Sequence, residues 1–468
     1  MSSHEALSER VFRVGRSPYP ASPGRAGSPK FFGMRTKADI VICGAGIAGA
    51  AAAFHLAVRR GAGRVVLVDE HEPLTVTSDK GTQGYRNWWP GPDDTMLRLV
   101  GRSIDLLEET AHESGNAFRM SRRGYLFATA DTARLAAMET TAAEVSSYGM
   151  GPLRRHTSAA SYTAPPAEGF EGQPDGADIL VGDAVRAAFP YLAPDTVGAV
   201  HVRRAGTMNA IVLGSWFLKR AAAHDTSVVR DRVVGFDTAG GRVHGVRLAS
   251  GDIIETDTVI LAAGPGVHAM GDMLGLDLPV KHELHAKMRF RDTRGAAPRN
   301  APFIIWNDPI EIGSETLPAG MHMRPVDLSH GDEVYLIWTY ETDPRPYVWP
   351  PTFDEHYPEI VLRGLARMIP GAAPYVGQGS SGYVDGGYYC KTAENRPLVG
   401  PLPVEGAYIV AALSGIGLMS SHACGELVAQ HVSGETLPEY ARWFLPSRYD
   451  DPQYRLLVSG WGSLVGQL

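Results

Sequence analysis

The clearest pattern near the start of the chain is a short apolar segment followed by glycines and then by an alanine-rich stretch. Residues 38–43 (ADIVIC) predict a buried strand, residues 44–49 (GAGIAG) a tight turn, and residues 50–60 a helix. Residues 64–68 (RVVLV) predict a second buried strand, which ends in two acidic residues about 20 positions after the last glycine. This order predicts a strand, glycine turn, helix and strand of a parallel α/β sheet.

Later segments have the composition and alternation of antiparallel strands. A β-meander is predicted from residues 228–236, 242–248 and 253–255. Residues 258–262 (TVILA) predict a strand that enters another glycine turn. A further antiparallel sheet is predicted from residues 282–290, 303–306, 321–324 and 333–340. Between these regions, residues 95–114 place apolar side chains three to four positions apart, which predicts a helix with one buried face.

Composition narrows the class of protein. The chain has 468 residues, 44% of them hydrophobic and 20% charged, which predicts two or three folded domains. The net charge is -7 and no stretch collects enough basic residues to follow a phosphate backbone, so we expect no nucleic-acid partner. Three widely spaced cysteines predict neither a disulfide framework nor a metal site, as is typical of a reducing cytoplasm.

The two most unusual segments do not predict a membrane protein. Residues 39–58 are the most apolar stretch, but they contain Asp39 and His55 and are dominated by alanine and glycine, so we expect no transmembrane helix. Residues 1–36 are rich in serine, proline, glycine and arginine without an apolar segment long enough for a signal peptide. They predict a flexible N-terminal arm, and we expect a cytoplasmic protein.

The glycine spacing has a direct physical meaning. Gly44 permits the tight turn, Gly46 lets the backbone approach a pyrophosphate, and Gly49 lets the helix pack on the sheet with its first amides facing the anion. Asp69 or Glu70 can then accept hydrogen bonds from ribose hydroxyls, which disfavours the 2'-phosphate of NADP. A second such motif is absent, and a single site near the front of a long chain favours FAD over NAD.

Four landmarks in this order resemble the D-amino-acid oxidase superfamily of FAD-dependent amine oxidoreductases, the group containing sarcosine oxidase, dimethylglycine dehydrogenase and glycine oxidase. They are VICGAGIAGAAAAFHLA (41–57), SDKGTQGYR (78–86), GTMNAIVLGSWF (206–217) leading to VILAAGPG (259–266), and GYYCKTAENRPLVG (387–400) followed by YIVAALSGIG (408–417). The resemblance covers residues 37 to about 449.

The resemblance implies an α/β fold with a Rossmann-type FAD-binding domain and an interleaved α+β substrate domain built on an antiparallel sheet. The implied FAD-binding domain comprises residues 37–84, 195–278 and 386–449, and the implied substrate domain comprises residues 85–194 and 279–385. Residues 450–468 would form a C-terminal tail.

The resemblance also implies which residues hold FAD. The ADP half would contact Gly44, Gly46, Ile47, Ala48, Gly49, Asp69 or Glu70, and Val233. The loop over the flavin would contribute Ser78 and Lys80, and Gly264 would pass beside the ribityl and pyrophosphate. The pyrimidine end of the ring would face Ser414, Gly415, Ile416 and Gly417.

Three positions depart from the family pattern. Gly387 stands where monomeric sarcosine oxidases attach the flavin through a cysteine; Cys390 lies three residues on and is expected to point elsewhere, so we expect non-covalent FAD. Ile416 replaces a histidine of the family's glycine loop, and Ile337 falls near the lysine that sarcosine oxidases use to activate oxygen. The electron acceptor, oxygen or another carrier, is therefore left open.

The substrate of such an enzyme carries a carboxylate, which an apolar pocket can hold only beside a cation. Arg324 resembles the strand-end arginine that binds the substrate carboxylate in glycine oxidase, and Arg86 is a second candidate. Tyr388 and Tyr389 could line the pocket. No catalytic acid or base is assigned, because hydride transfer needs only a neutral amine.

The resemblance implies FAD-dependent oxidation of the C–N bond of an amino acid or N-substituted amino acid, such as an N-alkylglycine, by hydride transfer to flavin N5 and hydrolysis of the imine. We expect an oxidase rather than a dehydrogenase. The alternatives are a carrier-coupled demethylating dehydrogenase and a non-catalytic flavoprotein assembly factor, which the segment 387–400 also resembles. The sequence does not determine the oligomeric state.

Overall fold

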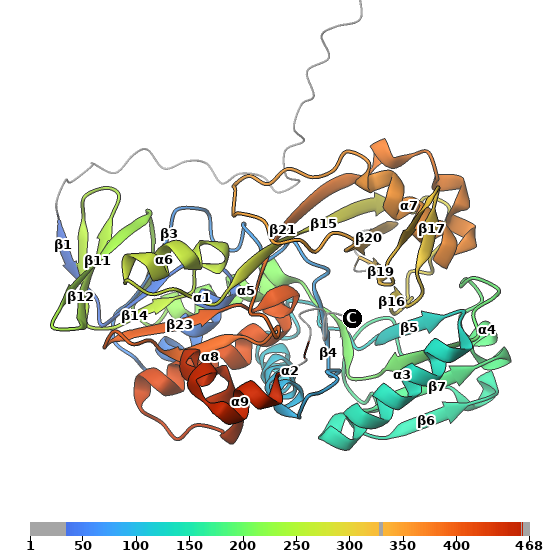
Figure 1. Ribbon diagram of the computed structural model, residues 1–468, viewed down its shortest axis with the longest axis horizontal. Coiled ribbons are helices and arrows are strands. Elements are labelled where there is room, and N and C mark those ends of the chain that lie inside the picture. Colours follow the sequence, from blue (N-terminus) through green and yellow to red (C-terminus); the bar gives the residue numbers. More distant parts are fainter. Residues whose placement is uncertain (1–33, 327–330, 460, 462–468) are drawn as a thin grey trace, which may run out of the picture.

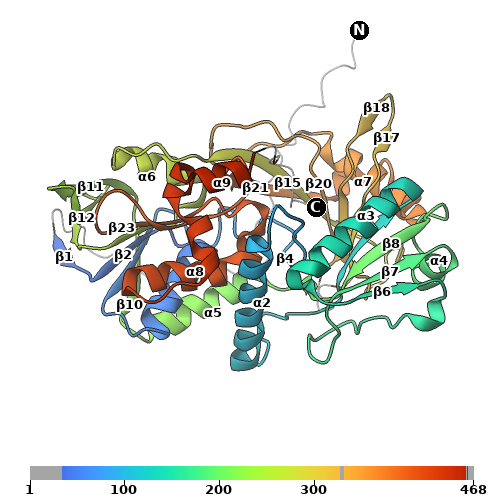
Figure 2. The ribbon, with the colours of Figure 1, turned by 60° about the horizontal axis from the view of Figure 1, so that its bottom comes forward.

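The computed structural model describes residues 34–326, 331–459 and 461, and these residues form two halves built on different sheets (Figures 1 and 2). The predicted N-terminal arm lies outside the described residues up to residue 33, and its end joins the fold as β1 (Arg35–Lys37). The predicted C-terminal tail is described to residue 459 and at 461, and it contains α9 (Pro452–Leu457). Its other residues lie outside the described part.

A six-stranded sheet carries the glycine turn and confirms the predicted Rossmann-type arrangement. In spatial order its strands are β10 (Thr226–Arg230), β3 (Val65–Asp69), β2 (Ile40–Cys43), β14 (Val259–Leu261), β23 (Ala407–Ala411) and β22 (Leu398–Pro401). All neighbours are parallel except β22, which is antiparallel to β23. Every side chain of β2 is buried because this strand lies inside the sheet and is covered on both faces, which explains its unbroken apolar sequence.

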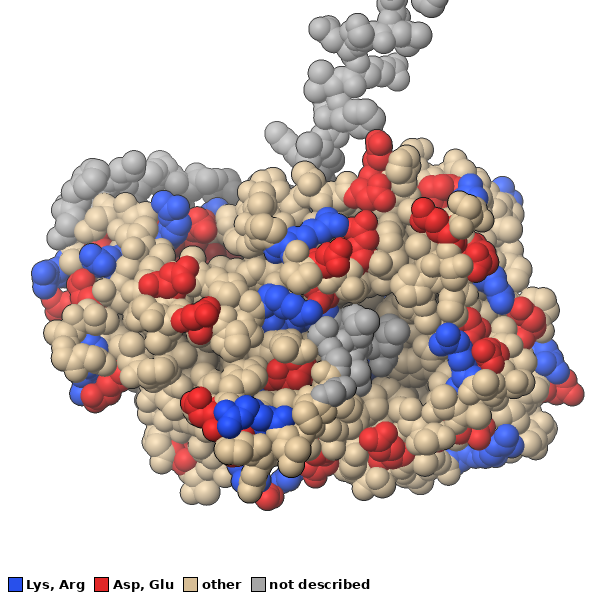
Figure 3. Space-filling view, viewed as in Figure 1, with Lys and Arg blue, Asp and Glu red and all other residues tan. Residues whose placement is uncertain are grey.

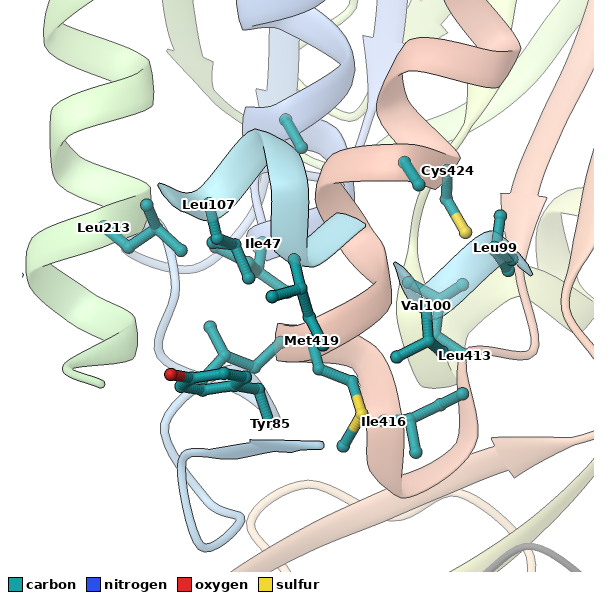
Figure 4. Close-up of a cluster of buried hydrophobic side chains, with 14 of the residues drawn as sticks. Ile47, Tyr85, Leu99, Val100, Leu107, Leu213, Leu413, Ile416, Met419 and Cys424 are labelled. Atoms are coloured by element: carbon teal, nitrogen blue, oxygen red, sulfur yellow. The ribbon is translucent and has the colours of Figure 1, made fainter. Parts of the chain in front are cut away.

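Four helices pack together beside this sheet. They are α1 (Ile47–Ala53), which continues as a π-helical turn over Phe54–Val58, α2 (Thr95–Ser114), α5 (Ala210–Ala222) and α8 (Gly417–Ser433). α1 contacts α5 and α8, α8 also contacts α2, and Figure 4 shows their apolar side chains converging around Ile47, Leu107 and Met419. α2 thus packs on a helix of the predicted FAD-binding domain although it lies within residues assigned to the substrate domain. The domain bounds stay a prediction.

A small sheet flanks the first one, with the order β1, β13 (Ile253–Glu255), β12 (Arg242–Leu248) and β11 (Val233–Ala239), and α6 (Val267–Met273) lies near β11. The sequence predicted a single strand over residues 228–236. That prediction was wrong, because β10 ends at Arg230 and β11 begins at Val233, and the two strands belong to different sheets.

The second half contains a nine-stranded sheet. In spatial order its strands are β21 (Tyr383–Lys391), β15 (Lys281–Arg291), β20 (Glu333–Trp338), β19 (Met321–Pro325), β16 (Phe303–Trp306), β5 (Tyr125–Thr129), β8 (Gly198–Val202), β7 (Ala177–Val181) and β6 (Leu153–His156). Neighbours are antiparallel except for the pairs β16–β5 and β6–β7. The predicted antiparallel substrate sheet is therefore present and larger than its four predicted strands.

Strand alternation gives the first strands of this sheet two different faces. One face is apolar and packs with α7 (Tyr357–Met368) in one hydrophobic cluster, to which Met288, Leu336 and Met323 contribute. The opposite face carries Glu283, His285 and other polar side chains, and it is directed toward the first half of the molecule. Beside the remaining strands lie α3 (Thr132–Val145) and α4 (Asp183–Ala188), and the hairpin of β17 (Ile310–Ile312) and β18 (Glu315–Leu317) contacts α7.

The two halves meet at β4 (Gly84–Arg86), which pairs with β9 (Ala205–Thr207) (Figure 1). On the face in Figure 3, acidic and basic side chains are interspersed, so this face presents no continuous basic surface. None of the described helices combines the length and the apolar character needed to cross a bilayer.

The glycine turn depends on close backbone contacts. A Cβ atom at Gly49 would lie 2.0 Å from the carbonyl oxygen of Gly44, whereas a Cβ atom at Gly266 would meet its nearest neighbour, the Cβ of Ala263, at 3.7 Å. We predict that Gly49→Ala lowers the free energy of unfolding by about 1–3 kcal/mol through overpacking. Gly266→Ala should change it by no more than about 1 kcal/mol.

Urea unfolding of the purified protein, followed by tryptophan fluorescence, measures both variants. Equal unfolding midpoints for Gly49→Ala, Gly266→Ala and the unaltered chain would show that the helix and the turn can separate without cost.

Candidate active site

A cavity of about 640 Å³ lies between the two halves and collects most of the predicted site residues. Those from the six-stranded sheet and its loops are Gly44, Gly46, Ile47, Ala48, Asp69, Glu70, Ser78, Val233, Gly264 and Ser414 to Gly417. Arg86, Tyr388 and Tyr389 line it from the side of the other sheet. We call this the first cavity.

The glycine turn at one end of the first cavity has the geometry that a pyrophosphate requires. Gly44 has a φ of 117°, and a Cβ there would lie 2.4 Å from the carbonyl oxygen of Ala262. Gly49 itself is absent from the lining, and its role is the close contact of α1 with the turn. The start of α1 therefore lies at this end of the cavity, where an anion is favoured.

The two candidate acids at the end of β3 differ in their contacts. Asp69 accepts hydrogen bonds from the backbone N–H groups of Ala45 (2.7 Å) and His71 (2.9 Å), so its carboxylate fastens the glycine turn to the strand. The Glu70 side chain is half exposed. Both acids line the first cavity, and Glu70 is the one whose oxygens are more accessible to a ribose.

The loop of residues 78–83 separates the first cavity from a second one. Ser78 Oγ accepts a hydrogen bond of 3.0 Å from the N–H of Ile47 at the start of α1. Lys80 does not line the first cavity; its Nζ lies 3.0 Å from Asp79 Oδ1 and 3.4 Å from Asp385 Oδ2, and it lines the second cavity. The expectation that Lys80 contacts the cofactor therefore lacks support from its position.

The opposite end of the first cavity is closed by the loop before α8. Ser414 has a φ of 51°, which is strained for a residue other than glycine, and its buried Oγ has no hydrogen-bond partner among the described residues. A Cβ at Gly415 would lie 2.5 Å from the ring of Tyr389, so only glycine permits this contact. The backbone of this loop and the N-terminus of α8 therefore form a surface that favours negative charge.

Arg86, the last residue of β4, lies where the two halves meet, and it is buried. Its guanidinium donates a hydrogen bond to the Tyr125 hydroxyl and lies 5.6 Å from the centre of that ring. Burial lowers the pKa of Arg86, because a charged group in this environment loses hydration. Nearby Phe303, His322 and Ile337 complete this part of the wall.

Arg324 lies elsewhere. It is on the same face of the sheet as His322 but lines the second cavity, of about 890 Å³, beyond the loop of residues 78–83. Its Nε donates a hydrogen bond to the Thr82 carbonyl, and its guanidinium lies 4.6 Å from the centre of the Tyr335 ring. The predicted contact of Arg324 with a substrate above the cofactor is therefore not supported by its position.

The strand β21 contributes Tyr388, Tyr389 and Cys390 to the first cavity. Cys390 pairs with His282 and therefore lies on the opposite face of β21 from Gly387 and Tyr389, so the expectation of non-covalent attachment at this position stays a prediction. Burial raises the pKa of the Cys390 thiol, so the thiol stays protonated and is a poor nucleophile toward a flavin. Gly387, at the position of the family's attachment cysteine, packs beside Lys80 and Thr77.

Sequence reasoning did not name Tyr125, His322 or Thr339, and it set His285 aside as a base that hydride transfer does not need, yet all four line the first cavity. Burial lowers the pKa of His322 to about 4. For His285 the sequence did contain a signal. Residues 281–291 (KHELHAKMRFR) place charged or polar side chains at every second position, which is typical of a strand with one polar face.

The cavity fits a flavin dinucleotide. It begins beside helix amides at the glycine turn, contains acids at the end of β3, and ends at a second helix N-terminus with an orphaned serine hydroxyl. The residues that could hold the ADP half come from β2, α1, β3 and β11, and those that could hold the ring come from β21 and the loop before α8.

Comparison with known proteins agrees with this fit. Residues 39–431 match the family model described as FAD dependent oxidoreductase, DAO. The human mitochondrial sarcosine dehydrogenase is 23% identical over 423 residues, an alignment that covers 85% of this chain and 40% of that protein. This chain thus spans less than half the length of that curated relative.

Solved structures share the fold. L-proline dehydrogenase from P. horikoshii superposes with a TM-score of 0.70 at 20% identity, covering 89% of this chain and 99% of that one. Glycine oxidase from Geobacillus kaustophilus superposes with a TM-score of 0.69 at 17% identity, covering 88% and 99%. The matched family model covers most of the chain and confirms FAD as the cofactor. The chain therefore belongs to the DAO family of FAD-dependent oxidoreductases.

Proposed function

We propose that this protein oxidises the C–N bond of an amino acid or N-substituted amino acid that binds by its carboxylate to Arg86. The observation that carries the proposal is the buried guanidinium of Arg86 in the wall of the first cavity. The similar proteins support it, because their names specify sarcosine, L-proline and glycine, all of which carry a carboxylate on the carbon next to nitrogen.

The distribution of charge within the first cavity favours this orientation. The acids that line the cavity lie on β3, on the loop after β3 and on the loop before β11; they are Asp69, Glu70, Glu72 and Asp231. Arg232 lies in the loop before β11 as well. Among the described lining residues outside those segments, Arg86 is the one lysine or arginine. A carboxylate beside Arg86 would offset the loss of hydration that lowers its pKa, and two parallel hydrogen bonds would orient the substrate.

The remaining walls suit a small substrate. Tyr389 packs against Gly415 and fixes one side of the cavity, while the Tyr388 hydroxyl accepts a hydrogen bond of 3.2 Å from the N–H of Val348. Bound FAD supplies the acceptor for the hydride and its two electrons. The chain's own contribution is to hold the C–H bond in one orientation and to exclude water from it. An N-alkylglycine meets these requirements.

A second candidate function, a carrier-coupled demethylating dehydrogenase, is favoured by one residue. Ile337 lines the first cavity near the position where sarcosine oxidases have their oxygen-activating lysine, and an isoleucine side chain cannot supply that charge. We keep the oxidase as the first candidate, and the fate of the electrons decides between them.

Anaerobic mixing of the purified yellow protein with glycine, sarcosine, L-proline and other amino acids should bleach the flavin absorbance near 450 nm. Readmission of air then separates the two candidates: rapid recovery of colour with peroxide release indicates an oxidase, and slow recovery that an artificial electron carrier accelerates indicates a dehydrogenase. A flavin that no amine reduces would contradict the enzymatic proposal and favour the assembly-factor alternative.

Arg86→Met should lower kcat/KM for a carboxylated amine on the order of 10²-fold, because hydrogen bonds to a charged group are lost. The same variant should leave its decarboxylated counterpart, such as dimethylamine for sarcosine, nearly unaffected, so the ratio of the two kcat/KM values collapses. Both are measured by stopped-flow flavin reduction.

The matched control is Arg324→Met, which removes a buried guanidinium of the second cavity. It should retain the ratio of the two kcat/KM values even where it lowers both. If Arg324→Met collapses the ratio and Arg86→Met does not, the carboxylate binds to Arg324 and our assignment is wrong.

A further inference from the structure

A buried carboxylate, Glu283 of β15, stands behind the wall of the first cavity. It is fully buried, as is Lys391 of β21, whose Nζ forms an ion pair with Glu283 Oε2. Lys281 Nζ lies 3.2 Å from the other carboxylate oxygen, and His285 Nε2 lies 3.3 Å from Oε2. Glu283 does not line the first cavity, so any influence on the site passes through a neighbour.

His285 is that neighbour. Its ring stacks on Tyr389 with 3.9 Å between the ring centres and 22° between the planes, and its Nδ1 lies 2.9 Å from Thr339 Oγ1. A carboxylate only accepts hydrogen bonds, so Nε2 of His285 donates to Glu283 and Nδ1 accepts from the Thr339 hydroxyl. His285 and Thr339 both line the first cavity, which gives a continuous chain from Glu283 to the cavity.

The charges in this chain are set by burial. Burial would raise the pKa of Glu283, but hydrogen bonds from His285 and Lys391 hold it at about 2. Burial lowers the pKa of His285 to about 4 against the effect of Glu283, and the charge of Lys391 contributes to the lowering. At neutral pH Glu283 is therefore an anion, and His285 is neutral with a lone pair on Nδ1.

Charged and polar groups face His285 from each neighbouring strand. Its own strand contributes Glu283 and Lys281, β21 contributes Tyr389 and Lys391, the residue after β20 is Thr339, and β19 contributes His322. Among these groups Glu283 is the one anion. A proton arriving on His285 is therefore stabilised from a single direction, along the Nε2–Glu283 hydrogen bond.

We propose that Thr339, His285 and Glu283 form a proton relay that takes one proton from the ammonium group of the substrate; this rests on the function proposed above. An amino acid in water carries an ammonium group, and no carboxylate of the described part of the chain lines the second-half wall of the first cavity to pair with it. Hydride transfer requires the neutral amine with its nitrogen lone pair.

Two coupled proton transfers precede the transfer of the hydride. The N–H proton of the ammonium moves to Thr339 Oγ1 while the hydroxyl proton of Thr339 moves to His285 Nδ1, which leaves a neutral amine and an imidazolium paired with Glu283. The C–H bond then breaks, the hydride with its two electrons passes to bound FAD, and the substrate becomes an iminium ion. Because burial holds the pKa of His285 at about 4, the imidazolium is short-lived: it forms only while the amine is being oxidised and then releases its proton to solvent, which resets the relay. Lys391 and Lys281 are positioning residues that hold Glu283.

The test is the pH dependence of anaerobic flavin reduction in the holoenzyme, between pH 6 and pH 10, with the amino acid that reduces the unaltered enzyme fastest. Thr339→Val keeps the shape of the side chain and removes the relaying hydroxyl. It should slow flavin reduction on the order of 10²-fold at pH 7, the range of general acid–base catalysis. The deficit should shrink as the pH approaches the pKa of the amine, because the substrate then arrives already neutral.

Thr342→Val is the matched control. Thr342 also lines the first cavity but takes no part in this chain of hydrogen bonds, so any change in the rate of its variant should be the same at every pH. His285→Gln gives an independent second measurement and should show the same recovery at high pH. Retained absorbance near 450 nm verifies that each variant still holds FAD.

A deficit of the same size at every pH, in both Thr339→Val and His285→Gln, would indicate a structural role and overturn the relay while leaving the proposed function intact. Failure of every amino acid to reduce the unaltered enzyme would overturn both proposals. The two failures are distinguishable because only the second is seen with the unaltered enzyme.

Discussion

Strand alternation in the nine-stranded sheet is the constraint on which the site depends. Successive side chains of a strand point to opposite faces, so the same strand must present apolar side chains to α7 and polar side chains to the opposite side of the sheet. In β15 Met288 and Phe290 enter the hydrophobic cluster, and the odd positions Glu283 and His285 lie on the opposite face. A shift of register by one residue would exchange the two sets, so the hydrophobic cluster also fixes the register of the polar groups.

Local sequence was sufficient for the βαβ unit of the FAD-binding half. The glycine turn, α1 and the acid at the end of β3 follow each other within about 30 residues, the length of one βαβ unit, and their geometry depends on backbone contacts that only glycine permits. Sequence could not decide between Asp69 and Glu70, because the decisive fact is which carboxylate the turn itself uses. The structure gives that role to Asp69 through the N–H of Ala45.

The substrate side was less predictable because its groups come from distant segments. His285 and Thr339 are 54 residues apart and meet only because β15 and β20 pair in one register. The choice between Arg86 and Arg324 depends on the loop of residues 78–83, which divides one polar sheet face into two cavities. The alternation of side chains within a single strand does not reveal where that loop lies.

Arg324 nevertheless contacts the loop that leads to Arg86. The Arg324 guanidinium donates to the Thr82 carbonyl, and Lys287 Nζ donates to the Asp79 carbonyl at 2.8 Å, so two buried cations tie this loop to the sheet. The loop leads directly into β4, whose last residue is Arg86. The proposed carboxylate-binding group thus lies on β4 and the proposed relay on the nine-stranded sheet, so the anchored loop sets the distance between them. Loosening either anchor would displace Arg86 relative to Thr339 without removing any group that touches the substrate.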